Sequence, residues 1–168
     1  MLVNAALENP GLFDRLVLVS APADDGVEGS RFPRPTGFIA KYRAAVAVED
    51  WHEIARIHAS NLVPEPEAVD LRKMVEMSMR NINHDIASRF FDSNPTMDIT
   101  DLVNGLPMPV LVMHGTADTQ APFSGSEYLA QQIPNSQHYA FEGKGHIPMQ
   151  TATKEFISAL SKFLASTG

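Results

Sequence analysis

Residues 110–114 form a short run of apolar side chains that ends at His114 and is followed by Gly115. Strands of a parallel sheet that are buried on both faces have such continuous apolar runs. The next residues, 116–122, which we name the acid loop, carry Asp118 and end at Pro122. Functional groups of open α/β sheets gather outside the carboxyl ends of the strands. This stretch therefore predicts an α/β fold in which Asp118 is a candidate catalytic acid.

A second loop of the same kind follows another strand-like run at 137–141. Residues 142–147, which we name the histidine loop, carry His146 just after Gly143 and Gly145. Glycines allow a tight turn, which would bring the imidazole over the strand ends. A histidine held by a carboxylate can take and return a proton during catalysis. We expect Asp118 and His146 to form such a pair.

The remaining segments alternate in a way that is typical of one α/β domain with a helical insertion. The apolar run at 16–20 predicts a first strand, and the helical spacing of apolar residues at 153–165 predicts a last helix that covers the sheet. Further helices are predicted at 2–8, 39–48, 51–61, 67–81, 84–93 and 126–132. We expect a short parallel sheet of about three strands flanked by helices. Its core would be residues 1–22 and 98–168, with residues 23–97 as a helical cap.

Composition excludes several classes of function. The chain has 168 residues, a formal charge of −7 and no cysteine. This charge leaves no basic surface for nucleic acid, and the missing thiols exclude disulfides and cysteine chemistry. No apolar run reaches the roughly 20 residues that span a bilayer, and the first residues lack the basic start of a signal peptide. We expect a cytoplasmic protein with no membrane partner and no cofactor.

Three segments resemble the C-terminal portion of the α/β-hydrolase superfamily. They are the helix-to-strand passage at 9–22, the acid loop with Gly115, Asp118 and Pro122, and the histidine loop with His146. They occur in the family's order, and the helical insertion occupies the place of the family's cap. The resemblance implies a hydrolase fold. It also implies that Asp118 and His146 are the acid and the base of a catalytic triad.

The third member of that triad, the nucleophile, is absent from these residues. The family places it on a G-x-S-x-G elbow between a strand and a helix, and no such motif occurs here. Ser20 ends a strand, but Ala21 and Pro22 cannot continue as the elbow's glycine and helix. The resemblance implies that the elbow and the oxyanion-hole donors precede this chain. Serine or aspartate could serve there. Epoxide hydrolases of the family, which use aspartate, resemble one another in having two tyrosines in the cap, whereas Tyr42 is the only tyrosine of this insertion. The resemblance therefore favours a small ester or related acyl substrate over an epoxide.

The cap offers candidates for substrate contact. Trp51, Met74 and Met77 could line an apolar pocket, since methionine adapts to irregular ligands, although packing within the cap explains them equally well. A zinc site is not expected, because Arg56 stands where a second ligand after His52 would be needed.

Three interpretations of the whole chain remain open. The favoured one is a truncated hydrolase that is inactive by itself. The second is a non-catalytic module of hydrolase descent that binds a ligand or a protein. The third is a half-enzyme completed by another chain at the sheet edge near Leu16 and Ser20, because an unpaired edge exposes backbone donors and acceptors.

Overall fold

The computed structural model describes residues 2–26, 29–82 and 98–166. Its sheet has three parallel strands in the order β1 (Leu16–Val19), β2 (Val110–Gly115) and β3 (Ser136–Phe141). Leu16 is paired with Val110, and Val110 in turn with Ser136. All six residues of β2 are buried, as expected for a central strand covered on both faces. The predicted fold class is confirmed.

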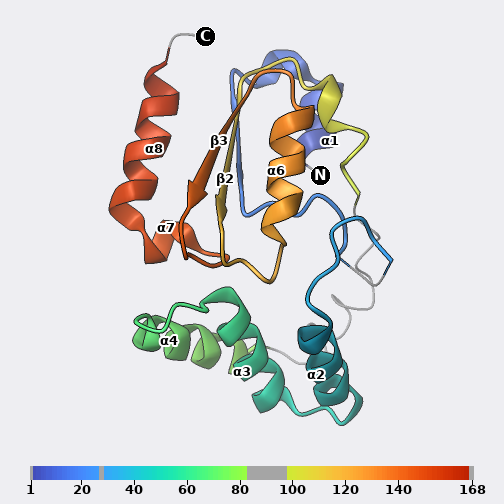
Figure 1. Ribbon diagram of the computed structural model, residues 1–168, viewed down its shortest axis with the longest axis vertical. Helices are drawn as coiled ribbons and strands as arrows, with labels where there is room; N and C mark the ends of the chain where they lie inside the picture. Colours follow the sequence, from blue (N-terminus) through green and yellow to red (C-terminus); the bar gives the residue numbers. More distant parts are fainter. Residues whose placement is uncertain (1, 27–28, 83–97, 167–168) are drawn as a thin grey trace.

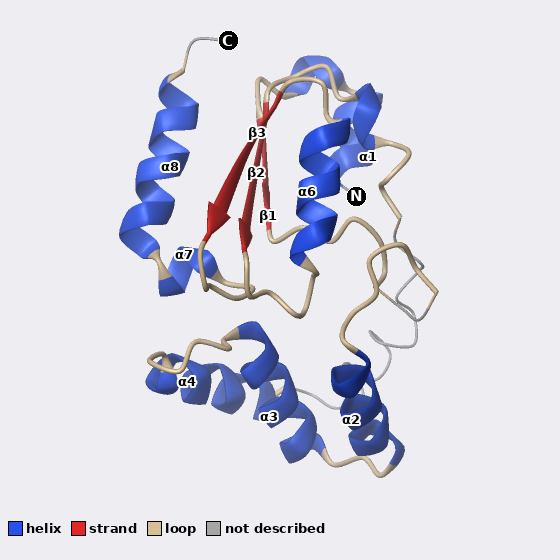
Figure 2. Ribbon diagram, in the orientation of Figure 1, coloured by secondary structure: helices blue, strands red, loops and turns tan. Residues whose placement is uncertain are grey.

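Helices cover both faces of this sheet (Figure 2). Side chains alternate along a strand, so Val110 and Val112 pack on one face with α1 (Leu2–Glu8) and α6 (Phe123–Gln132). Leu111 and Met113 pack on the other face with α8 (Thr153–Ala165), where Phe163 is fully buried. The short helix α7 (Pro148–Thr151) leads into α8. The last helix therefore covers the sheet as predicted.

Part of the predicted apolar face of α8 is exposed, however. Phe156, Leu160 and Phe163 contact the core, whereas Ile157 and Leu164 are more than half exposed. The apolar stripe of α8 is therefore wider than the part that contacts the sheet.

Three helices lie together beyond the carboxyl ends of the strands (Figure 1). We name α2 (Thr36–Ala47), α3 (Trp51–Leu62) and α4 (Val69–Arg80) the helical layer. Asp50 caps α3 by accepting a hydrogen bond of 3.0 Å from the Glu53 amide, as its position before the helix leads one to expect. Ala45, Ile54 and Ile57 form a small core of their own between α2 and α3. The layer thus faces the loops that follow β2 and β3.

Several details differ from the sequence prediction. Helix α2 begins at Thr36, directly after Pro35, and α6 begins at Phe123, directly after Pro122. Proline fixes its own backbone and has no amide hydrogen to lose, so it suits the start of a helix. The turns η1 (Pro10–Leu12) and η2 (Val103–Gly105) and helix α7 were not predicted. The helix predicted at 84–93 lies outside the described residues, and the division into core and cap remains a prediction.

Within the described residues, β1 pairs only with β2 and is an edge of the sheet. Its inward side chains, Leu16 and Leu18, are nevertheless buried by the helices. No described helix is long and apolar enough to cross a membrane.

Candidate active site

Asp118 lies in the turn after β2, with its side chain fully shielded from solvent. Its Oδ1 accepts hydrogen bonds from the amides of Gln120 (2.8 Å) and Ala121 (3.0 Å). Its Oδ2 lies 2.9 Å from Nδ1 of His146. The backbone therefore fixes one carboxylate oxygen and leaves the other directed at the histidine.

The charge of this carboxylate is well supported. Burial raises the pKa of Asp118, but hydrogen bonds from His114 and His146 outweigh burial, and the pKa falls from 3.8 to about 2. The group is thus an anion at neutral pH despite being buried. A buried anion beside an imidazole favours the ring form whose Nδ1 carries a proton, and it stabilises the imidazolium that proton uptake would produce.

His146 reaches Asp118 because the histidine loop packs closely on the end of β2. The amide of Thr116 donates to the carbonyl of Phe141, and the amide of Ala117 donates to that of Lys144. A Cβ on Gly115 would lie 2.2 Å from the carbonyl oxygens of both Lys144 and Gly145, so only glycine fits this position. The side chain of His146 is 25% exposed, in contrast to Asp118. The acid is buried and the base can be reached.

The end of α3 contacts both loops of this pair. Asn61 is buried, donates to Oε1 of Gln120 at 2.6 Å and accepts from the Thr119 hydroxyl. The amide of His146 donates to the carbonyl of Leu62 at 3.1 Å. The helical layer therefore helps to position the loops that carry Asp118 and His146.

Glu65, just beyond α3, adds a further contact. It is 3% exposed, and its Oε1 accepts a hydrogen bond of 2.8 Å from the amide of Gly145. At the surface, Lys144 and Glu67 form an ion pair of 3.0 Å. No local pattern in the sequence marks Glu65, because its partner lies 80 residues further along the chain.

His114, at the end of β2, also belongs to this cluster. Its ring is completely buried, and its Nε2 lies 2.9 Å from Oδ2 of Asp118 and 2.8 Å from the carbonyl oxygen of Ala121. Asp118 Oδ2 therefore has an imidazole on two sides. The only sequence signal for this arrangement is the spacing of four residues between His114 and Asp118.

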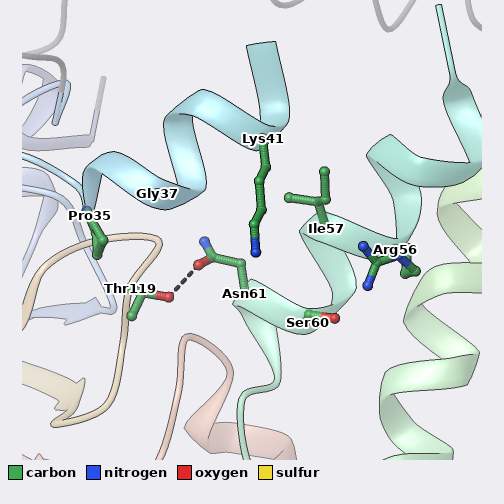
Figure 3. Close-up of a pocket in the computed structure, with 8 residues that line it drawn as sticks. All are labelled: Pro35, Gly37, Lys41, Arg56, Ile57, Ser60, Asn61 and Thr119. Carbon is green, nitrogen blue, oxygen red and sulfur yellow. Dashed lines mark hydrogen bonds between the residues drawn. The ribbon is translucent and has the colours of Figure 1, made fainter. Parts of the chain in front are cut away.

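A pocket of about 280 Å³ opens beside the acid loop, between α2 and α3 (Figure 3). Thr119, the residue after Asp118, forms part of its wall, and Lys41 points into it toward Asn61. The other lining residues are Pro35, Gly37, Arg56, Ile57 and Ser60. Neither Asp118 nor His146 lines this pocket, which borders the acid loop only through Thr119 and is small for a ligand site.

The three residues predicted to contact substrate do not line this pocket. Trp51 packs against the core of α2 and α3, and Met74 and Met77 lie on α4 with 58% and 63% of their surface exposed. Their role in binding stays a prediction.

Neither Ser20 nor Ser126 is paired with His146 in the described residues. Ser20 is buried at the end of β1 with φ of 47°, and its hydroxyl has no hydrogen-bond partner within the described structure. Ser126 lies 3.1 Å from Nε2 of His138, but its proton is directed to the carbonyl of Phe123 and its side chain is inaccessible. Across the described ranges, no group of three or more acidic, histidine or cysteine side chains could hold a metal ion.

Curated relatives are similar over a limited stretch. No protein-family model matches the chain. A pimeloyl-[acyl-carrier protein] methyl ester esterase from Vibrio parahaemolyticus is 31% identical over 67 residues, which are 40% of this chain and 26% of that enzyme. One from Nitrosomonas europaea is 29% identical over 63 residues. The matched stretch is thus about a quarter of the curated relatives' length.

Solved structures are similar over nearly the whole chain. An esterase from Rhodococcus sp. has a TM-score of 0.80 and 22% identity, and the match covers 99% of this chain and 62% of the esterase. An alpha/beta hydrolase from a Medee basin deep-sea metagenome library has a TM-score of 0.77 and 16% identity, with 99% and 62% covered. The chain spans about three fifths of these structures. It therefore has the α/β-hydrolase fold, of which its 168 residues contain a part.

Proposed function

We propose that Asp118 and His146 are the acid and the base of a hydrolase site that acts on a small ester or related acyl substrate. The observation that carries the proposal is the 2.9 Å contact between Asp118 Oδ2 and His146 Nδ1 at the carboxyl ends of the strands. With Nδ1 bound to the acid, the other ring nitrogen is left to exchange a proton with reacting groups.

The nucleophile would come from residues outside this chain. His146 would take the proton of a serine nucleophile, or activate water against a covalent intermediate, and would then protonate the leaving group. Asp118 would hold the ring and stabilise its charged form. By itself the chain would lack both the nucleophile and the oxyanion hole, and we propose that it is inactive alone.

The substrate class rests on size and on likeness. The pocket beside Thr119 holds about 280 Å³, which favours a small ligand. The curated relatives are named as methyl ester esterases, and a structural neighbour is named as an esterase. We infer an ester or acyl substrate for this chain on that ground.

The test has two arms. The chain alone is mixed with p-nitrophenyl butyrate, and the released nitrophenolate is followed through the first turnover; we expect no burst equal to the protein concentration. The nucleotide sequence upstream of Met1 is then read for an in-frame G-x-S-x-G elbow or its aspartate form. A protein extended to include that elbow should show turnover that His146→Ala abolishes.

A burst from the unextended chain that is lost in His146→Ala would contradict the external nucleophile. Turnover in the extended protein that is unchanged by His146→Ala would contradict the role of the pair.

A half-enzyme completed by another chain is the second candidate, and the unpaired edge of β1 in the described sheet favours it over a simple binding module. Here the nucleophile would arrive on a partner segment that pairs with β1. Size-exclusion chromatography tests the half-enzyme, because a stable solitary monomer would argue against a partner chain.

A further inference from the structure

His114 stands behind the acid of the candidate site and is not exposed to solvent. Its Nε2 lies between two oxygen atoms, Oδ2 of Asp118 at 2.9 Å and the carbonyl of Ala121 at 2.8 Å. Both oxygens can only accept a hydrogen bond, since Asp118 is ionised. A ring nitrogen placed between two acceptors has to carry the proton. Nδ1 of His114 is buried without a hydrogen-bond partner in the described structure, where a bare lone pair is better tolerated than an N–H group.

We propose that His114 is a positioning residue: its Nε2–H donates to the same Asp118 oxygen that accepts from His146, and thereby limits how strongly Asp118 binds His146. The consequence for a reaction rests on the proposed function, whereas the competition between the two rings does not.

The two rings contact the same oxygen of a carboxylate whose acceptor positions are all used. A carboxylate has about four acceptor positions. Two are taken by the amides of Gln120 and Ala121 on Oδ1, and two by His114 and His146 on Oδ2. Each donor draws electron density from the same group, so the hydrogen bond to one ring weakens when the other ring also donates. His114 is buried with its Nε2 between two oxygen atoms, whereas His146 is partly exposed. The contact of Asp118 with the buried His114 should therefore stay the same while its hydrogen bond with the partly exposed His146 changes.

Other charged groups near the pair already have partners of their own. Lys144 pairs with Glu67, Glu65 binds the amide of Gly145, and Arg34 donates to the carbonyl of Gln120. On the far side, His138 stacks on the ring of Phe123, which also contacts the His114 ring edge-on. Within the described residues, the Asp118 carboxylate accepts hydrogen bonds from His146 and the two amides, and Nε2 of His114 lies 2.9 Å from it.

Removal of the His114 donor should therefore change Asp118 in a specific way. In His114→Phe, which keeps an aromatic ring but has no N–H, Asp118 should bind a proton about tenfold more tightly, a rise in its pKa of about one unit. The Asp118–His146 hydrogen bond should strengthen, and the Nδ1 proton of His146 should move downfield in the NMR spectrum. His114→Gln retains an N–H donor. In this variant both the Asp118 pKa and the position of the His146 proton signal should therefore be closer to their wild-type values.

The measurement is carboxyl carbon-13 NMR of Asp118 in the 168-residue protein, from about pH 7 down to about pH 2, where the wild-type carboxyl titrates. His138→Phe is the matched control, because it removes a histidine beside the same Phe123 ring but none of the donors to Asp118. The proposal is supported if only His114→Phe raises the Asp118 pKa. An unchanged Asp118 titration in folded His114→Phe, or an equal change in His138→Phe, would overturn it.

The unmutated protein supplies a second test if His114→Phe does not fold. Nitrogen-15 spectra distinguish a ring protonated at Nε2 from one protonated only at Nδ1. We expect His114 to be protonated at Nε2, and a His114 found only in the Nδ1–H form could not donate to Asp118 and would overturn the proposal. Neither test depends on hydrolysis, so a failure of the ester assay leaves this result standing.

Discussion

The amide of Gly145 donates a hydrogen bond of 2.8 Å to the buried Oε1 of Glu65. This contact attaches the histidine loop to the segment that follows α3. Beside it, the amide of His146 donates to the carbonyl of Leu62. The helical layer therefore also positions the histidine loop, because displacement of the end of α3 would move Gly145, the residue next to the candidate base.

Gly145→Ala tests how closely the two segments pack. The added Cβ would lie 2.2 Å from Cδ of Pro64 and 3.0 Å from the carbonyl oxygen of Leu62. We expect a loss of about 1–3 kcal/mol in the free energy of unfolding, as for other overpacked sites, measured by urea denaturation. Gly11→Ala is the matched control, since nothing lies within 4 Å of its added Cβ, and it should change stability by less than about 0.5 kcal/mol. Equal effects from the two variants would contradict close packing at Gly145.

Glu65→Ala should leave the Gly145 amide without its acceptor. A buried amide that loses its partner costs about 1–3 kcal/mol, so this variant should be destabilised by that amount. Glu65→Gln keeps a carbonyl acceptor and should lose much less. Amide hydrogen exchange of Gly145 checks the mechanism, because exchange should become faster in Glu65→Ala and stay slow in Glu65→Gln. Unchanged exchange in both variants would mean that this hydrogen bond does not protect the loop.

Asp118 should make stability depend on pH in acid. Its pKa is about 2 in the folded protein and 3.8 as the ordinary value, so the unfolded chain binds its proton first as pH falls. The resulting stabilisation, about 2 kcal/mol, is fully present above pH 3.8 and is lost as pH falls to about 2. The advantage of the wild type over Asp118→Asn should therefore shrink within this window. An advantage that stays constant across it would contradict the lowered pKa.

His58 should act in a separate and higher window. Burial and then the positive charge of Arg34 lower the pKa of His58 from 6.5 to about 4. Below pH 6.5 His58 binds a proton in the unfolded chain but not in the folded one. The free energy of unfolding should therefore fall by about 3 kcal/mol between pH 6.5 and 4. Urea denaturation of His58→Gln should show a smaller fall over this range. A wild-type fall that His58→Gln reproduces in full would assign it to other groups.

The sequence was sufficient for those parts of the fold that have a local signal. The apolar runs around Leu18 and Val112 predicted strands because a strand buried on both faces needs them, and the loops after β2 and β3 predicted where Asp118 and His146 would meet. Helix starts were less accurate at Pro35 and Pro122, where the proline rather than the apolar spacing determines the first residue.

The supporting contacts of the site could not be predicted in the same way. Glu65 and Gly145 are 80 residues apart, and nothing in either neighbourhood indicates the other. His114 had a visible neighbour in Asp118, but its orientation depends on how the acid loop turns back to bring Ala121 to the ring. Trp51, Met74 and Met77 were chosen by residue type alone, and residue type does not tell which face of a helix borders a pocket.

We propose that Asp118 orients His146 as a base, with the proton on Nδ1. Nitrogen-15 NMR of the His146 ring, recorded near pH 8.5 where an ordinary imidazole is neutral, tests it directly. We predict the Nδ1–H form in the wild type, with a proton signal that is shielded from exchange and lost in Asp118→Ala. A His146 ring protonated at Nε2 instead, or one whose tautomer is the same with and without the Asp118 carboxylate, would contradict the account.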